Sequence, residues 1–297
     1  MISIKDDYVV LMDKNSNTTV TNAMTIDVED YFQVSAFEPY IPRALWDSIP
    51  CRIEFCMDRI LDLLDQKQIK ATFFTLGWIA ERYPLMIKRM ADNDHEIASH
   101  GWGHRRVTDL SPAEFREDIV RSKALLEDLS GQKVIGYRAP SFSINRHNLW
   151  ALDSLAEAGY CYSSSIYPVR HDHYGMPDSP RFAYYPRGDN GVLEIPATTV
   201  RLWGRNFPAA GGGFFRFWPY ILSKWFINRV NQCESQAVIF YFHPWEIDAD
   251  QPRQSGINFK TRFRHYLNLH HMEERLAALT SDFKWDRVDR IFLPNQT

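Results

Sequence analysis

The sequence predicts an α/β fold, a distorted (β/α) barrel of seven strands with a C-terminal extension. Short apolar runs typical of buried strands alternate with amphipathic runs typical of helices through the first two-thirds of the chain. This alternation implies parallel strands connected by crossover helices. Several of the strand-like runs also end at a titratable residue, as strands do at the rim of a barrel where active sites lie.

Composition and charge exclude several other classes of protein. Of the 297 residues, 45% are hydrophobic and 24% are charged, which is typical of a globular domain. The net charge of −3 provides no basic surface for nucleic acid. No apolar run approaches the ~18 residues of a membrane span, and the N-terminus lacks the pattern of a secretion signal. We therefore expect a cytoplasmic protein with no membrane span and no nucleic-acid partner.

Local patterns place the individual elements. The helix expected at 111–131 has the clearest ends, because Ser111 and Glu114 form a capping-box pattern and Gly131 follows the last turn. The other helices are expected at 53–69, 84–94 and 146–159, and the strands at 23–27, 70–77, 95–100, 134–140, 160–168 and from 236 to its end at His243 and Pro244.

Two stretches show no such pattern. Residues 1–20 are polar and are expected to form a flexible leader. The run AAGGGFFRFWPY at 209–220 combines glycines with aromatic residues, which indicates a loop whose backbone lies close to another group. No linker follows residue 20, so we expect residues 21–297 to form one domain that includes the C-terminal extension.

The polar residues at the predicted strand ends are candidates for a shared site. Each alone would more often be structural, but all of them fall on one predicted rim. They are Asp27, Glu29 and Asp30 in TIDVED, His100 and His104 in SHGWGH, Arg138 in YRAP, and His243 in FYFHP.

The two histidines have the spacing of a metal site. His100 and His104 are four residues apart, but Gly101 and Gly103 between them disfavour a helix, so we expect a ligand pair on a loop. Two imidazoles and one carboxylate are a common open ligand set for a divalent metal such as zinc. The alternative is a glycine-rich turn whose histidines face solvent.

The acidic residues after the first strand can supply both a ligand and a base. Asp27 and Glu29 are two apart and point to the same side of an extended chain. One could bind the metal while the other accepts a proton from the attacking water, and Asp30 remains a competing ligand. Arg138 beside the base would keep it ionised and oriented.

With these motifs, about residues 22–297 resemble the polysaccharide deacetylases, a carbohydrate esterase family 4-like group that shares the chitooligosaccharide deacetylase homology domain. The likeness is greatest to a bacterial branch encoded near exopolysaccharide and exosortase-type sorting loci. SHGWGH is similar to the family's His-(Ser/Thr)-x-x-His motif, with Gly101 in the Ser/Thr position. RAP is similar to its Arg-x-Pro motif, and FYFHP to its Leu-x-His motif, with Tyr241 in the Leu position.

Two motifs depart from the family pattern. The usual Thr-Phe-Asp-Asp is replaced by TIDVED, which resembles the Asp-x-Asp form of a minority of members and makes Asp27 the base and Glu29 the ligand. Ser163 stands where the family usually carries an aspartate that tunes the catalytic histidine, so what polarises His243 is open.

The resemblance implies a metal-dependent hydrolase that removes N-acetyl groups from N-acetylhexosamine units of a bacterial exopolysaccharide or its precursor. Asp27 would be the base, oriented by Arg138, and His243 would protonate the departing amine. A backbone N–H near Ser141 would help to hold the oxyanion. The metal would be zinc, with cobalt, nickel or iron as alternatives, and its ligands would be Glu29, His100 and His104.

Two other functions remain open. The fold also hosts hydrolases of cyclic imides and ureides, and a small amide substrate of that kind would need a closed pocket. A glycan would need an open groove with exposed aromatic residues, for which the candidates are Trp102, Trp203, Trp218 and Trp245. A non-catalytic carbohydrate-binding relative should lack the base, the acid or a metal ligand, whereas this sequence retains candidates for all of them.

Overall fold

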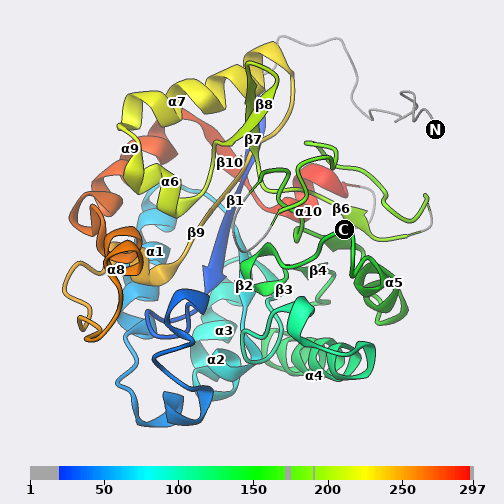
Figure 1. Ribbon diagram of the computed structural model, residues 1–297, viewed down its shortest axis with the longest axis vertical. Helices are drawn as coiled ribbons and strands as arrows, with labels where there is room; N and C mark the ends of the chain where they lie inside the picture. Colours follow the sequence, from blue (N-terminus) through cyan, green and yellow to red (C-terminus); the bar gives the residue numbers. More distant parts are fainter. Residues whose placement is uncertain (1–19, 171–174, 190, 295–297) are drawn as a thin grey trace.

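Parallel strands form one curled sheet in the middle of the molecule (Figure 1). The structure, a computed structural model, describes residues 20–170, 175–189 and 191–294. Seven strands run in the order β9-β1-β2-β3-β4-β5-β6, which confirms the predicted barrel class, and an eighth, β10, pairs with the first residues of β1. The strands are β1 (Thr21–Val28), β2 (Thr72–Thr75), β3 (Glu96–Ser99), β4 (Gly136–Tyr137), β5 (Tyr162–Ser163), β6 (Leu193–Glu194), β9 (Ile239–Phe242) and β10 (Lys284–Asp286).

The barrel is distorted on the side between β6 and β9. Within the described ranges these two strands are not paired with each other, so strand pairing does not close the sheet there. An antiparallel hairpin, β7 (Thr199–Leu202) and β8 (Arg205–Pro208), precedes a bridge between Gly211 and Tyr241 of β9. The chain thus covers this side with a hairpin and a loop instead of another barrel strand.

Alternation along β1 sends its polar residues into the barrel. The even-numbered residues from Met24 to Val28 pack with the buried apolar side of α1 in the largest apolar cluster. Because successive side chains of a strand point to opposite faces, Thr25 and Asp27 face the barrel interior. The carboxyl-terminal half of β1 therefore presents polar side chains to the barrel interior.

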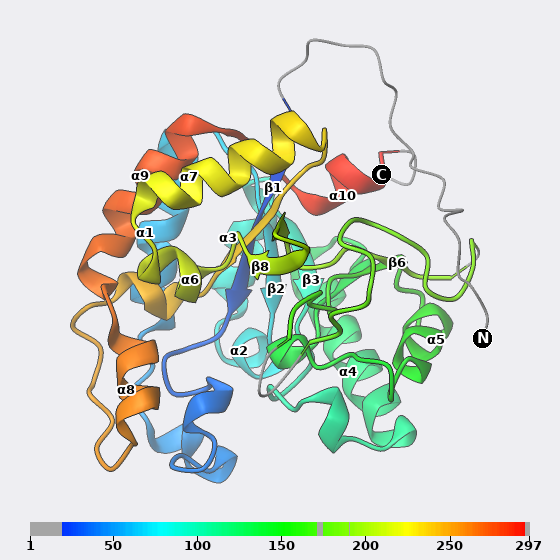
Figure 2. The same ribbon diagram turned by 45° about the horizontal axis from the view of Figure 1, so that its top comes forward.

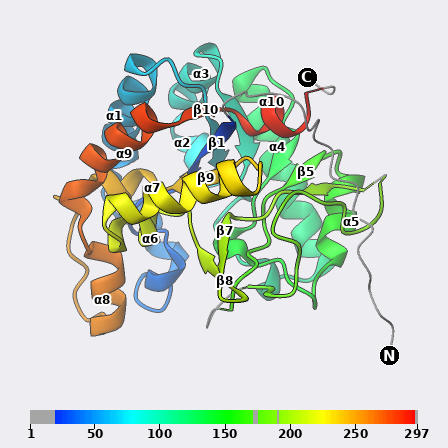
Figure 3. The same ribbon diagram turned by 90° about the horizontal axis from the view of Figure 1, so that it is seen from above.

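The connecting segments form helices whose apolar positions recur at three- and four-residue intervals. Figures 2 and 3 show α1, α7 and α9 on one side of β1, and α4 and α5 on the other. None of the helices in the described part of the chain is long and apolar enough to span a membrane. The helices are α1 (Ile53–Gln66), α2 (Gly77–Arg82), α3 (Pro84–Asp92), α4 (Pro112–Ser130), α5 (Trp150–Glu157), α6 (Gly212–Phe217), α7 (Tyr220–Asn228), α8 (Phe259–Tyr266), α9 (Met272–Asp282) and α10 (Val288–Phe292).

Local side-chain hydrogen bonds decide where two of these helices begin. At α4 the predicted capping box is confirmed, since Ser111 Oγ accepts the Glu114 N–H at 3.3 Å and the Glu114 carboxylate accepts the Ser111 N–H at 2.9 Å. Gly131 ends that helix with φ +68°. In contrast, α5 begins later than predicted, because Asn148 Oδ1 accepts the Asn145 N–H at 2.7 Å and holds a turn ahead of the helix.

The two stretches without a periodic pattern have different outcomes. The expected leader at 1–20 lies, apart from residue 20, outside the described residues. The prediction of a loop over 209–220 is wrong from Gly212 onward, where α6 begins. Phe215 and Arg216 of this helix are both buried, and this tertiary burial outweighs the low helix propensity of glycine.

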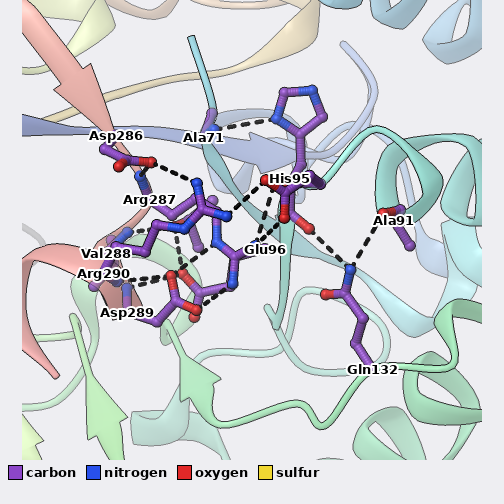
Figure 4. A network of polar contacts seen from close by, with 12 residues as sticks. Ala71, Ala91, His95, Glu96, Gln132, Asp286, Arg287, Val288, Asp289 and Arg290 are labelled. Carbon is purple, nitrogen blue, oxygen red and sulfur yellow. Dashed lines mark hydrogen bonds and ion pairs between the residues drawn. The ribbon is translucent and has the colours of Figure 1, made fainter. Parts of the chain in front are cut away.

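A polar network fixes the C-terminal segment at the end of the barrel opposite Asp27 (Figure 4). Glu96 begins β3, and its carboxylate accepts hydrogen bonds from Tyr162 Oη at 2.8 Å, Thr72 Oγ1 at 2.5 Å and the Asp289 N–H at 3.2 Å. Arg287 donates to Asp289 Oδ1 at 2.9 Å. Burial and the charge of Asp289 outweigh the three donors and raise the pKa of Glu96 to about 8.

This raised pKa predicts a pH dependence of stability that Glu96→Gln should remove. In the unfolded chain Glu96 ionises near its usual pKa of 4.5, whereas in the folded protein it keeps its proton until about pH 8. The free energy of unfolding therefore decreases as the pH rises from 4.5 to 8. The free energy of unfolding of Glu96→Gln, relative to the natural protein, should therefore rise from pH 5 to pH 8, as measured by urea denaturation. A difference that stays constant with pH would contradict a protonated Glu96.

Candidate metal centre and active site

The carboxyl ends of four strands bring the predicted site residues together. Asp27 lies in β1 with Glu29 just beyond it, and the other three strands are β3, β4 and β9. In parallel strands these ends share one rim, so residues far apart in sequence meet there. The residues that follow β3, β4 and β9 are His100, Arg138 and His243.

Glu29, His100 and His104 form a compact, buried cluster. Each offers one ligand atom, and these atoms lie within 4.8 Å of one another. The histidines are only 2% and 5% exposed, so the alternative of a turn with solvent-facing histidines is wrong. They lie on a loop, as predicted, in which Gly101 has φ +74° and His104 has φ +53°. The glycine permits the turn that aims both rings inward.

The lone pairs in this cluster fit a divalent cation. Glu29 Oε2 is buried without a hydrogen-bond donor, although His104 Nε2 lies 2.8 Å away. The Nδ1–H of His100 donates to the Arg138 carbonyl at 2.8 Å, which leaves its Nε2 free as a ligand. Burial lowers the pKa of His100 to about 4, so this ring is neutral. Burial alone would raise the pKa of Glu29, but the charges of His104 and His243 lower it to about 2.

The third acidic residue, Asp30, has a different role. Its Oδ1 accepts the Tyr31 N–H at 2.8 Å, and its Oδ2 accepts the N–H groups of Arg52 at 2.6 Å and Ile53 at 3.0 Å. These contacts bind the first turn of α1, where backbone N–H groups have no partners within the helix. Of the two competing carboxylates, only Glu29 therefore lies with the histidines.

Asp27 is held by a fully buried arginine. Arg138 Nη1 donates to Asp27 Oδ1 at 2.5 Å and to Thr25 Oγ1 at 2.9 Å, and its Nη2 donates to Ser164 Oγ at 3.1 Å. The other carboxylate oxygen, Oδ2, lies 3.9 Å from His243 Nε2. Asp27 thus presents one fixed oxygen to Arg138 and the other to the centre of the site.

His243 borders both carboxylates. Its Nε2 lies 3.5 Å from Glu29 Oε1, and its Nδ1 lies 2.7 Å from Glu246 Oε1. Burial would lower the pKa of His243, but the charges of Glu29, Glu246 and Asp27 raise it to about 9. Glu246 was missed in the sequence, where the only signal is a glutamate three residues after the strand-end histidine. Ser163 instead hydrogen-bonds Ser165 at 2.8 Å.

The four candidate tryptophans and Ser141 differ in how far they are exposed and in what they contact. Trp245 is a packing residue, because its ring is stacked between His243 and His265, with centroids 5.3 Å and 4.2 Å away. Trp203 at the hairpin is 90% exposed. Trp102 and Trp218 are partly buried. Ser141 has φ +56°, and the role of its N–H as an oxyanion donor stays a prediction.

Fold and site together define an α/β-barrel protein with a candidate metal centre and a carboxylate–histidine pair beside it. Residues 45–162 match the family model described as polysaccharide deacetylase. Residues 164–293 match a second model, described as a domain of unknown function (DUF3473).

Individual relatives support the same family. The chain is similar to a peptidoglycan-N-acetylglucosamine deacetylase of Bacillus cereus, with 35% identity over 96 residues that cover 32% of this chain and 35% of the relative. It is also similar to a chitooligosaccharide deacetylase of Bradyrhizobium, with 30% identity over 34% of this chain and 44% of the relative. The matches thus span less than half the length of either relative.

A solved structure shares the fold. A Mycobacterium smegmatis protein assigned to the polysaccharide deacetylases has a TM-score of 0.58, at 19% identity and with coverage of 91% of this chain and 89% of that one. The likeness extends across both matched regions of the chain, so the barrel fold is common to the two proteins.

The ligand set predicts which variants lose metal. His104→Ala removes one of three candidate ligands, so the affinity for Zn²⁺ should fall by more than about 100-fold, the upper end of the loss seen when a residue that only supports a ligand is removed. Isothermal titration of metal-stripped protein measures this. Asp30→Asn is the control: it should keep the metal affinity while costing about 1–3 kcal/mol of unfolding free energy, because N–H groups at α1 lose their acceptor. Unchanged affinity in His104→Ala would refute the assignment.

Proposed function

We propose that the protein is a metal-dependent hydrolase that removes N-acetyl groups from N-acetylhexosamine units of a bacterial glycan, with an exopolysaccharide or its precursor as the substrate. The observation that carries this proposal is the convergence of a cation-binding cluster, an arginine-held aspartate and a histidine, with His243 Nε2 3.5 Å from Glu29 and 3.9 Å from Asp27. These are the parts that amide hydrolysis needs: a Lewis acid, a base and an acid.

Asp27 acts as the general base. A bound divalent metal would polarise the acetyl carbonyl and lower the pKa of the attacking water toward about 7. The free oxygen of Asp27 accepts the proton of that water, while Arg138 holds the other oxygen at 2.5 Å and fixes the direction of the carboxylate. Glu29 is engaged by the histidines and is less suited to take a proton.

His243 acts as the general acid. An amine leaves poorly as an anion, so a proton must reach its nitrogen as the C–N bond breaks. The carboxylates of Glu29, Glu246 and Asp27 raise the pKa of the imidazole, which favours a proton on Nε2. That nitrogen faces Asp27 and Glu29 and is in position to serve a substrate between them.

The glycan substrate is favoured over a cyclic imide or ureide by the relatives. Both named relatives act, by their names, on N-acetylated or chito-type glycans. The retention of candidates for base, acid and metal ligands disfavours a binding protein without turnover. Zinc remains the metal that we propose first for this ligand set.

An acetate-release assay tests the proposal. The protein with Zn²⁺ should release acetate from N-acetylglucosamine oligomers or N-acetylated exopolysaccharide and should not open hydantoin-type rings. Asp27→Asn removes the base without changing its size, so kcat should fall by about 10²–10⁴-fold with metal affinity retained.

Two outcomes would overturn this assignment. Acetate release from no glycan, with metal bound, would favour the binding-protein alternative. Full turnover in Asp27→Asn would show that another group takes the proton.

A further inference from the structure

Glu246 is the direct partner of the catalytic-site histidine. Its Oε1 accepts from His243 Nδ1 at 2.7 Å and also from the His243 backbone N–H at 3.1 Å. A carboxylate at Nδ1 favours the tautomer with a proton on that nitrogen and fixes the plane of the ring. The opposite nitrogen, Nε2, is then aimed at Asp27 and Glu29.

A buried arginine makes this carboxylate possible. Glu246 is 0% and Arg216 is 2% exposed, and Arg216 Nε donates to Glu246 Oε2 at 2.7 Å. The guanidinium is held in turn by the backbone carbonyls of Leu267 at 2.5 Å and His265 at 3.0 Å. A buried carboxylate needs such charge pairing, since an isolated one would take up a proton.

The glycine run before Arg216 provides the space for Glu246. A Cβ at Gly212 would lie 2.1 Å from Glu246 Oε1 and 2.4 Å from Oε2, so no other residue fits beside the carboxylate in its present place. At the adjacent Gly213, a Cβ would meet nothing within 4 Å. The α6 segment therefore contributes both the space for the carboxylate, at Gly212, and the guanidinium that pairs with it, at Arg216.

We propose that Glu246 and Arg216, with Gly212 as the space-making residue, form a positioning unit that sets the tautomer and direction of His243. All of these residues lie in the region 164–293, which matches the family model described as a domain of unknown function. The inference rests on the proposed function for its kinetic consequence, but the contact itself is independent of it. The region of unknown function thus completes the active site of the deacetylase region.

The adjacent glycines give a matched pair of variants. Gly212→Ala should displace the Glu246 carboxylate while leaving every charge in the protein unchanged, so kcat should fall by about 10²-fold or more with little change in KM. Gly213→Ala has the same chemistry in open space and should keep the natural kcat. Equal kinetics in the two variants would overturn the proposal.

A second pair removes the charge instead. Glu246→Gln should lower kcat to a similar degree, whereas Glu234→Gln, in the separate ion pair with Arg181, should not. Zn²⁺ affinity measured by titration should stay within about 10-fold in Glu246→Gln, since it is not a ligand. Loss of the metal in this variant would refute a positioning role.

The histidine can also be observed directly, without turnover. In ¹⁵N NMR spectra of the metal-free natural protein recorded above pH 9, where the His243 ring is neutral, His243 should show a protonated Nδ1 and an unprotonated Nε2, and this pattern should change in Gly212→Ala and not in Gly213→Ala. The His243 signal is assigned by its loss in His243→Gln. An unprotonated Nδ1 in the natural protein would overturn the proposal even if the variants failed to fold. If no glycan were deacetylated, the proposed function would fail while this spectrum still tested the unit.

Discussion

The site depends on compensating the charge of carboxylates that the fold takes out of water. A buried carboxylate costs several kcal/mol unless it is paired and hydrogen-bonded. Asp27 is paired with Arg138, and Glu246 is paired with Arg216. Glu29 is not paired with an arginine: its charged neighbours are the imidazoles of His104 and His243, and one of its oxygens has no hydrogen-bond donor. The oxygen without a donor, on the carboxylate that lies with two histidines, therefore makes Glu29 the acidic residue best suited to bind a divalent cation.

The site is not contained in either matched region alone. Asp27 and Glu29 precede residues 45–162, which contain the two histidines of the cluster, and His243 belongs to residues 164–293. The parallel sheet explains this arrangement. Because β9 pairs with β1, the strand end that carries His243 lies next to the strand end that carries the acidic residues. A segment that is distant in sequence becomes the direct neighbour of the first strand, and the second region is part of the same barrel.

Features set by local sequence were predictable, and features set by distant contacts were not. The ends of α4 follow from Ser111 and Gly131, which act within a few residues of themselves. The strand-end positions of the site residues follow equally from short patterns. The role of Asp30 was open because only the packing of α1 shows which carboxylate turns away from the histidines. From the sequence, Gly212 was expected to lie in a loop. The need for glycine there comes from the close approach of the Glu246 carboxylate, which lies 34 residues further along the chain and could not be read from the local pattern.

Burial also gives the site a direction. The side chains of Asp27, Glu29 and His104 are no more than 6% exposed, whereas that of His243 is 21% exposed. Solvent therefore reaches the site at His243, while the candidate cation-binding cluster is more deeply buried. In the proposed reaction the amine belongs to the sugar and stays with the bulk of the glycan, while the acetyl group enters the buried part. This orientation would place the acid, His243, next to the leaving nitrogen and the metal ligands next to the carbonyl. The more exposed residue would thus serve the part of the substrate attached to the glycan, and the buried residues would serve the acetyl group.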